Sequence, residues 1–228
     1  MRFATLPVGN ENLLAQEFGF SREAEPMAAA IARGETRAMD LVRIRSAEDA
    51  GQTPTVDRLF TLMASCGFDA QVIHALDRWR KGASGDGLRR VSRQSYVKRI
   101  IEVVRNYRYP AVTLVADGRE VTGHQAYVFN LPRYGGGLKF APDARGDDQQ
   151  LNWVVFERPG FLRLLGYHAM VVCGRHGRAK TVACGHANRV SLRSAGGQGV
   201  PTQADGDPAG HSPLDLTVLP GALRVIRI

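Results

Sequence analysis

Asp205 and Asp207 are two acidic residues separated by one glycine, and they lie between two predicted strands. In an extended segment, side chains two residues apart point the same way. One carboxylate could then act as a base while the other stays near a metal ion. Asp-Gly is also common in β-turns for purely conformational reasons. The residues alone therefore leave two interpretations, an acid–base pair and a turn.

A second candidate site is the segment from Gly9 to Asn12, which precedes a predicted helix over residues 13–18. Backbone N–H groups and an amide side chain at a helix N-terminus are suited to binding phosphate. An ordinary capped helix explains the same residues, with Asn10 as the N-cap. Both interpretations stay open.

An acidic loop runs from Arg145 through Asp147 and Asp148 to Gln150. Carboxylate and carbonyl oxygens are the ligands that hard cations such as Mg²⁺ prefer, although a solvated loop has the same composition. The three cysteines and six histidines show neither zinc spacing nor a disulfide framework. We therefore assign no chemistry to the cysteines or histidines.

The positive charge of the chain is concentrated in one segment. From Arg78 to Arg108 there are ten basic and two acidic residues, so this segment carries a charge equal to the net +8 of the whole chain. Such a field attracts phosphate backbones or acidic lipid headgroups, and a solvated helix face is the alternative. Aromatic residues make up only 7% of the chain and form no stacking pattern, so we expect no nucleic-acid partner.

The composition is that of a globular protein. The chain has 228 residues, which suits one large or two small domains, and 44% of them are hydrophobic. The apolar runs are far shorter than the ~20 residues that span a bilayer, and Pro7 interrupts any signal-like start. We expect a soluble cytoplasmic protein that makes peripheral contact with the inner membrane face. The oligomeric state cannot be inferred from the sequence.

The periodicity of apolar residues predicts an α+β fold that is rich in strands. Helices are predicted over 13–18, 26–33, 69–79, 92–107 and 161–173. Strands are predicted over 2–7, 40–45, 58–65, 111–116, 119–122, 124–130, 151–157, 189–193, 200–204, 214–218 and 223–228. Turns are expected at Asp117-Gly118, at Asp205-Gly206-Asp207-Pro208 and at Pro220-Gly221.

Three stretches, in this order, resemble motifs of one family. Residues 6–15, LPVGNENLLA, are similar to L-P-x-G-T-x-N-D/L-x-A, with Asn10 in the Thr position. Residues 130–137, NLPRYGGG, followed by Ala141-Pro142-Asp143-Ala144 and Asp147-Asp148, resemble N-x-x-x-Y-G-G-G…P-x-A-x-x-x-D-G-x-L-D, with Gln149 and Asn152 replacing Gly and Asp. Residues 203–208, QADGDP, and 219–223, LPGAL, look like Q-x-D-G-E…V-x-P-x-A-L. Together they resemble the diacylglycerol kinase-type lipid kinases.

The resemblance implies a fold in two parts. Residues 1–37 would be a remnant of an α/β nucleotide-binding domain. Residues 38–228 would be a β-sandwich domain that binds lipid, with the last strand packing back on the first part. The implied reaction is ATP-dependent transfer of the γ-phosphoryl group to a hydroxyl of diacylglycerol or a related lipid.

The resemblance also implies roles for individual residues. Asp205 takes the position of the general base, and Asp207 the acidic position near the nucleotide metal. Residues that would contact the nucleotide are Gly9, Asn10, Asn12 and Asp207. A structural Mg²⁺ would be held by the Asp148 side chain and the carbonyls of Arg145 and Gln150.

One family motif does not occur in this sequence. The family carries a G-G-D-G-T loop over the ATP phosphates, and the chain begins at the strand that would follow this loop. About two βα units, on the order of 60–80 residues, would be absent. Two explanations stay open, a true start further upstream and a truncated or degenerate copy. The alternative function is accordingly a non-catalytic module that binds lipid or a partner protein.

Overall fold

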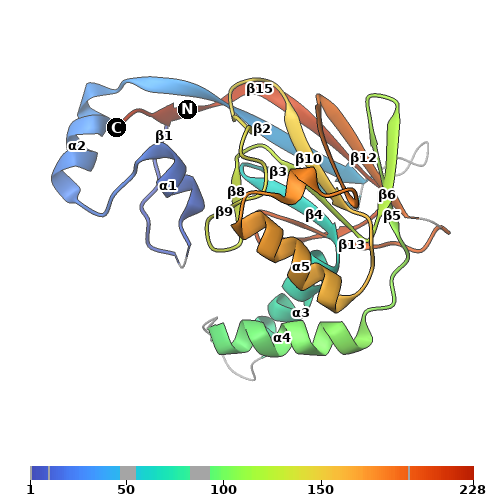
Figure 1. The fold of residues 1–228 in the computed structure, drawn as a ribbon. Coiled ribbons are helices and arrows are strands. Elements are labelled where there is room, and N and C mark those ends of the chain that lie inside the picture. Colours follow the sequence, from blue (N-terminus) through green and yellow to red (C-terminus); the bar gives the residue numbers. More distant parts are fainter. Residues whose placement is uncertain (1, 10, 47–54, 83–92, 195) are drawn as a thin grey trace.

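The computed structural model of the protein describes residues 2–9, 11–46, 55–82, 93–194 and 196–228, and its main body is a sandwich of two β-sheets (Figure 1). The first sheet has the strand order β3-β2-β15-β12-β5-β6, and β1 pairs with β15 in parallel. Its strands are β1 (Arg2–Phe3), β2 (Thr36–Ser46), β3 (Asp57–Phe60), β5 (Val112–Ala116), β6 (Arg119–Gly123), β12 (Arg189–Ser194) and β15 (Leu214–Ile226).

The second sheet has the order β11-β10-β7-β4-β13-β14. Its strands are β4 (Met63–Gly67), β7 (Gln125–Phe129), β10 (Leu151–Phe156), β11 (Val182–Ala187), β13 (Pro201–Ala204) and β14 (Asp207–His211). Every residue of β4 and β7 is buried, because the sandwich covers one face of this sheet and helices and loops cover the other. A short ribbon of β8 (Arg133–Tyr134) and β9 (Leu138–Lys139) lies outside both sheets.

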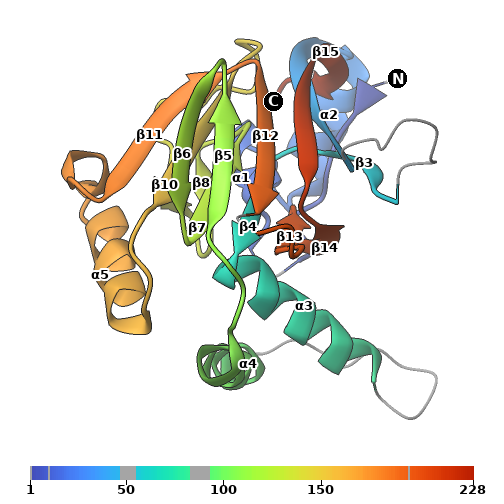
Figure 2. The same cartoon turned by 90° about the vertical axis from the view of Figure 1, so that its right-hand side faces the viewer.

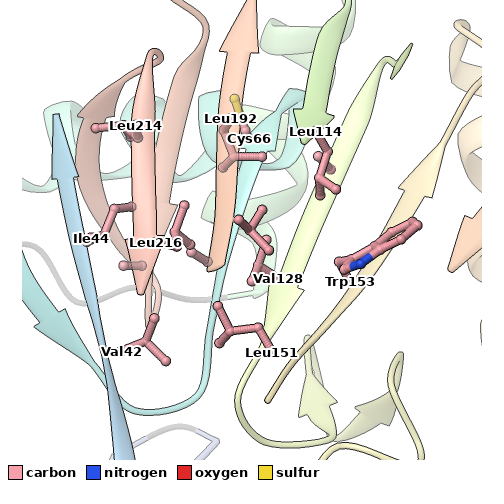
Figure 3. Close-up of a cluster of buried hydrophobic side chains, with 14 of the residues drawn as sticks. Val42, Ile44, Cys66, Leu114, Val128, Leu151, Trp153, Leu192, Leu214 and Leu216 are labelled. Atoms are coloured by element: carbon pink, nitrogen blue, oxygen red, sulfur yellow. The ribbon is translucent and has the colours of Figure 1, made fainter. Parts of the chain in front are cut away.

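The core between the sheets follows from alternation along the strands. Val42 and Ile44 of β2 are both fully buried, and Leu214 and Leu216 of β15 continue the same layer. Figure 3 shows these side chains facing Val128 and other residues of the second sheet. Because successive side chains of a strand point to opposite faces, every second residue enters this core.

Three helices lie on the outer side of the second sheet (Figures 1 and 2). They are α3 (Phe68–Lys81), α4 (Arg93–Asn106) and α5 (Phe161–Val172). Val72 and Ala75 of α3 pack against Val103 of α4, as expected for amphipathic helices. Among the described residues, no helix is long and apolar enough to cross a membrane.

The N-terminal segment forms a small unit at one end of the sandwich, with both chain termini beside it (Figure 1). It contains α1 (Leu13–Phe18) and α2 (Ala24–Arg33), and Phe20 and Met27 pack there against Val225 near the end of β15. The proposed domain boundary after residue 37 lies inside β2, which pairs with β15 along its whole length. That boundary stays a prediction.

The α+β fold with a β-sandwich is confirmed, and each predicted helix lies close to its predicted range. Asp117 and Gly118 both have positive φ, 48° and 81°, as a two-residue hairpin turn requires. The predicted N-cap at Asn10 is wrong, because Asn12 occupies the N-cap of α1, and Asn10 lies outside the described residues.

Two strand predictions are wrong in an informative way. Residues 58–65 form two strands in different sheets, and Thr61 and Leu62 carry the chain from one sheet to the other. Pro220-Gly221 is no turn, because β15 continues through it with a register shift between Leu219 and Leu223. Strands β11 and β14 were not expected from the sequence.

Candidate functional site

The predicted general base, Asp205, lies in a two-residue turn between β13 and β14. Asp205 and Gly206 have φ angles of 50° and 87°, and the flanking residues Ala204 and Asp207 pair with each other. This is the geometry of a type I′ hairpin turn, so the extended arrangement of the two carboxylates does not occur. Asp207 opens β14 with an exposed side chain.

Both carboxylate oxygens of Asp205 accept hydrogen bonds from the crossover between the sheets. Oδ2 accepts from the N–H and the hydroxyl of Thr61, at 2.7 and 2.8 Å. Oδ1 accepts from the N–H groups of Leu62 and Met63, at 2.8 and 3.1 Å. A carboxylate has about four acceptor positions, so donors of the crossover occupy all the acceptor positions of Asp205.

The crossover is also held by the second family-like stretch. The Asn130 side-chain amide donates to the carbonyls of Asp40 and Thr61, at 2.9 and 2.8 Å. The backbone N–H groups of Asn130 and Leu131 both donate to the carbonyl of Leu62. Residues 130–137 and 203–208, far apart in the sequence, therefore meet at Thr61 and Leu62.

Asp69, in the first turn of α3, is the centre of a second polar cluster. Its carboxylate accepts from the Ser65 hydroxyl at 2.6 Å, from the Tyr134 hydroxyl at 3.0 Å and from the Gln203 amide at 3.4 Å. Burial raises the pKa of Asp69, whereas these hydrogen bonds and the nearby His168 lower it. The cluster joins β4, β8 and β13 to the start of α3.

The glycine-rich turn after Tyr134 contacts the N-terminal unit. Gly135, Gly136 and Gly137 all have positive φ, which other residues rarely adopt. The N–H of Gly136 donates to Glu11 Oε1 at 3.0 Å, and Arg133 lies 3.6 Å from Glu17 Oε2. All three family-like stretches are thus connected through a few direct contacts.

In the predicted phosphate-binding segment, Gly9 and Asn12 form hydrogen bonds with each other. The N–H of Gly9 donates to Asn12 Oδ1, and Asn12 Nδ2 donates back to the Gly9 carbonyl, both at 2.7 Å. These groups are engaged with each other in the structure, and α1 behind them is only six residues long. We therefore derive no step through a bound nucleotide.

The predicted magnesium loop is organised around buried Asp40. Asp40 accepts from the N–H groups of Gln149 and Gly221, at 2.7 Å each, and its own N–H donates to the Gly146 carbonyl. Asp148 is exposed and accepts from the N–H of Gln150 at 3.1 Å, while the side chain of exposed Arg145 pairs with Asp147.

The described residues contain no cluster of three His, Cys, Asp or Glu side chains able to hold a metal. One exposed carboxylate with two backbone carbonyls and water suits Mg²⁺, which keeps several of its waters in proteins. By its donor chemistry the loop therefore fits a structural ion held by Asp148 and the carbonyls of Arg145 and Gln150. This assignment stays a prediction.

A cavity of about 280 Å³ lies between α4, α5 and the ends of strands β7 and β10 of the second sheet. Phe68, Val104, Phe156, Phe161 and Leu164 provide apolar walls. His124, Gln125 and Arg158 add polar groups, and burial lowers the pKa of His124. Tyr107 also belongs to the lining, and its hydroxyl is buried and has no hydrogen-bond partner in the described part of the chain.

The two helices that form the cavity also expose apolar side chains. Val97 and Ile101 of α4 are 54% and 46% exposed, and Leu162 and Leu165 of α5 are 81% and 51% exposed. We call these four residues the α4–α5 apolar face. Exposed cations stand on the same helices or beside them, at Arg78, Lys98, Arg105 and Arg108. Arg89 and Arg90 of the predicted basic segment lie outside the described residues.

The fold and these clusters define a β-sandwich protein with helices on one outer face. The family described as "YegS C-terminal NAD kinase beta sandwich-like domain" matches residues 62–227. The chain belongs to this family of diacylglycerol kinase- and YegS-like lipid kinases, which confirms the resemblance noted in the sequence.

Individual relatives agree with this placement. The diacylglycerol kinase of Mycobacterium tuberculosis (strain ATCC 25618 / H37Rv) is 29% identical over 97% of this chain and 68% of its own length. A crystal structure of a diacylglycerol kinase from Bacillus anthracis covers 96% of this chain and 64% of its own, at 12% identity and a TM-score of 0.59. Two further structures from that organism match with TM-scores of 0.65 and 0.63. The chain thus spans about two thirds of the length of these relatives.

Sequence reasoning missed the Asp69 cluster. Asp69 was placed only as the start of a helix, and Ser65 as the end of a strand. The available signal was the spacing of four between Ser65 and Asp69 around Gly67, which places a hydroxyl and a carboxylate at one strand-to-helix corner. The partners Tyr134 and Gln203 come from distant segments and give no local signal.

Proposed function

We propose that this protein is a lipid kinase that transfers the γ-phosphoryl group of ATP to a hydroxyl of diacylglycerol or a related lipid. The observation that carries the proposal is the apolar cavity between α4 and α5, in a chain related to diacylglycerol kinases. Clefts with apolar walls and a few polar groups are typical of small-molecule sites.

The chemistry of the cavity suits part of an acyl chain. Each methylene that leaves water for apolar walls contributes about 0.8 kcal/mol. The unpartnered Tyr107 hydroxyl would donate to an ester carbonyl of the lipid, which removes the cost of a buried donor without an acceptor.

We further propose that the α4–α5 apolar face and the cations around it dock on an anionic membrane. The apolar side chains would enter the headgroup boundary while the cations contact acidic lipids, each worth about 1 kcal/mol near the surface. This arrangement would bring the cavity mouth to the surface that holds the acyl chains. Charge complementarity is the reason to choose a membrane as the occupant of this face.

In the proposed reaction, Asp205 accepts the proton of the lipid hydroxyl. Its oxygens already accept hydrogen bonds from Thr61, Leu62 and Met63, so one of these bonds must be exchanged for the substrate hydroxyl. ATP would supply the phosphoryl group, and Mg²⁺ would neutralise the charge of its phosphates. The roles of Asp207, Gly9, Asn10 and Asn12 near the nucleotide stay predictions.

A second candidate is a lipid-binding module without phosphoryl transfer. The cavity and the apolar face both lie within the described residues, and these features alone would suffice to bind a lipid. This candidate predicts vesicle binding that weakens with salt and no affinity for ATP.

The cavity can be tested by filling it. In mixed vesicles, Val104→Trp should raise the KM for diacylglycerol about tenfold, because displacing two methylenes forfeits about 1.6 kcal/mol. Ile31→Trp, at an exposed position of α2, is the control and should leave the KM unchanged. An unchanged KM in Val104→Trp would show that the cavity does not hold the lipid.

A further inference from the structure

Asp69 is a carboxyl group bound by hydroxyl and amide groups rather than by cations. In the described part of the chain no lysine or arginine forms an ion pair with it. Its partners are side chains of β4, β8 and β13, three separate segments of the chain. Because only neutral donors hold this carboxyl group at the helix start, the strength of its hydrogen bonds depends on whether it is ionised or protonated.

A continuous line of hydrogen bonds connects Asp69 to the turn that carries Asp205. The Ser65 hydroxyl donates to Asp69 Oδ2 at 2.6 Å and accepts from Gln203 Nε2 at 3.0 Å. On the other end of the same amide, Gln203 Oε1 accepts from the N–H of Gly206 at 2.9 Å. Gly206 is the second residue of the type I′ turn, directly after Asp205.

The direction of the Ser65 hydroxyl depends on the charge of Asp69. Ionised Asp69 is only an acceptor, so Ser65 donates to it and keeps a lone pair for the Gln203 amide. Protonated Asp69 is a weaker acceptor, so its hydrogen bonds from the Ser65 hydroxyl and the Gln203 amide weaken and both side chains are less firmly held. The orientation of Gln203, and with it the bond to Gly206, therefore follows the protonation of Asp69.

We propose that Asp69 is a positioning residue, which holds the Asp205–Gly206 turn in place through Ser65 and Gln203. Its role in catalysis rests on the proposed function, because the turn carries the predicted base of that reaction. The titratable groups around Asp69 are Tyr134 of β8, Tyr127 of β7, Tyr96 of α4 and His168 of α5. Burial raises the pKa of each of these tyrosines and of Asp69 itself.

The coupling can be measured without any activity, by following the Gly206 amide signal of ¹⁵N-glycine-labelled full-length protein through a pH titration. In the wild type we expect a midpoint above the ordinary value of about 3.9 for Asp. It should disappear in Asp69→Asn. In Ser65→Ala, which keeps the carboxyl group, the amplitude of the response should fall sharply, because only the 3.4 Å contact between Gln203 and Asp69 then remains. Asp77→Asn, on the same helix, is the control and should retain it.

An unchanged Gly206 midpoint in Asp69→Asn overturns the inference, whether or not the protein phosphorylates lipid. Should Asp69→Asn not fold, an unchanged amplitude of the Gly206 response in Ser65→Ala overturns it equally. If the wild type phosphorylates diacylglycerol, Asp69→Asn should lower kcat about tenfold, leave KM unchanged and remove the acidic limb of the pH profile. A wild type that phosphorylates no lipid but shows the coupling contradicts the proposed function and supports the inference.

Discussion

At the scale of single residues, Asp205 combines a structural task with its predicted catalytic one. Four donors from the 61–63 crossover converge on its two oxygens. Asp207, two residues further along, is exposed at the start of an edge strand. The two carboxylates of the Asp-Gly-Asp sequence therefore have very different environments, although they look equivalent in the sequence.

This difference predicts different costs for the same substitution. Asp205→Asn should lower the free energy of unfolding by about 1–3 kcal/mol, because an amide nitrogen would face backbone donors that then lack an acceptor. Asp207→Asn should change it by less than about 0.5 kcal/mol, as usual for exposed sites. Urea unfolding of both variants measures the contrast, and equal stabilities would contradict the role of Asp205 at the crossover.

The site could be predicted only in part at this scale. The Asp-Gly turn was one of two interpretations, because the preference of Asp-Gly for turns is local. The hydrogen bonds that decide the function of Asp205 come from Thr61 to Met63, more than 140 residues earlier. For Asp69 the local signal was its spacing from Ser65, whereas its partners Tyr134 and Gln203 lie 65 and 134 residues further along the chain.

At the scale of elements, the corner between β4 and α3 positions Asp69. Gly67 is the N-cap of α3 with φ 120°, and a Cβ there would lie 2.6 Å from the His124 carbonyl oxygen. The corner turns the chain sharply, so that Ser65 and Asp69 face each other across it. Only glycine meets both the dihedral and the spatial requirement.

A matched pair of substitutions separates these two requirements. Gly160 is the N-cap of α5 with φ 105°, and no atom lies within 4 Å of its Cβ position. Gly160→Ala should cost about 1–2 kcal/mol from backbone strain alone, and Gly67→Ala clearly more because a backbone contact is added. Thermal and urea unfolding give both values, and equal costs would show that the His124 contact yields easily.

Elements were predictable where the pattern is local. Tyr96, Ile100, Val103 and Tyr107 follow helical spacing, and α4 was correctly expected there. Strand β14, residues Asp207–His211, contains proline and glycine and few strand-forming residues, so only its pairing with β13 makes it a strand. The break between β3 and β4 depends in the same way on tertiary partners, Asn130 and Asp205.

At the scale of the whole molecule, the cavity and the apolar face lie on the same helices. We expect Val97→Asp/Ile101→Asp to reduce binding to vesicles containing phosphatidylglycerol at least tenfold, through lost apolar burial and added repulsion. The control is Ile31→Asp, at a similarly exposed position of α2, which should bind as the wild type does. Flotation assays at low and high salt measure this, and equal binding of all three proteins would contradict membrane docking by α4.

The overall fold was more predictable than the site, because the fold follows largely from local sequence patterns and the site from contacts between distant segments. Alternating apolar residues in the strands, such as Val42 and Ile44 or Leu214 and Leu216, indicate a strand-rich fold, and the family resemblance added the β-sandwich. The convergence of residues 130–137 and 203–208 at Thr61 and Leu62 depends on the sheet order, which no local pattern encodes. The family resemblance supplied the candidate roles before the structure showed how the residues meet.

The most direct test of the proposed function is whether this protein transfers phosphate to a lipid. The protein would be incubated with magnesium, ATP and vesicles that contain diacylglycerol, and the extracted lipid would be analysed by mass spectrometry. We expect phosphatidic acid to accumulate with time and enzyme concentration, and only when both ATP and diacylglycerol are present. Vesicles that bind the protein yet yield no phosphorylated lipid would contradict the kinase and favour the lipid-binding module.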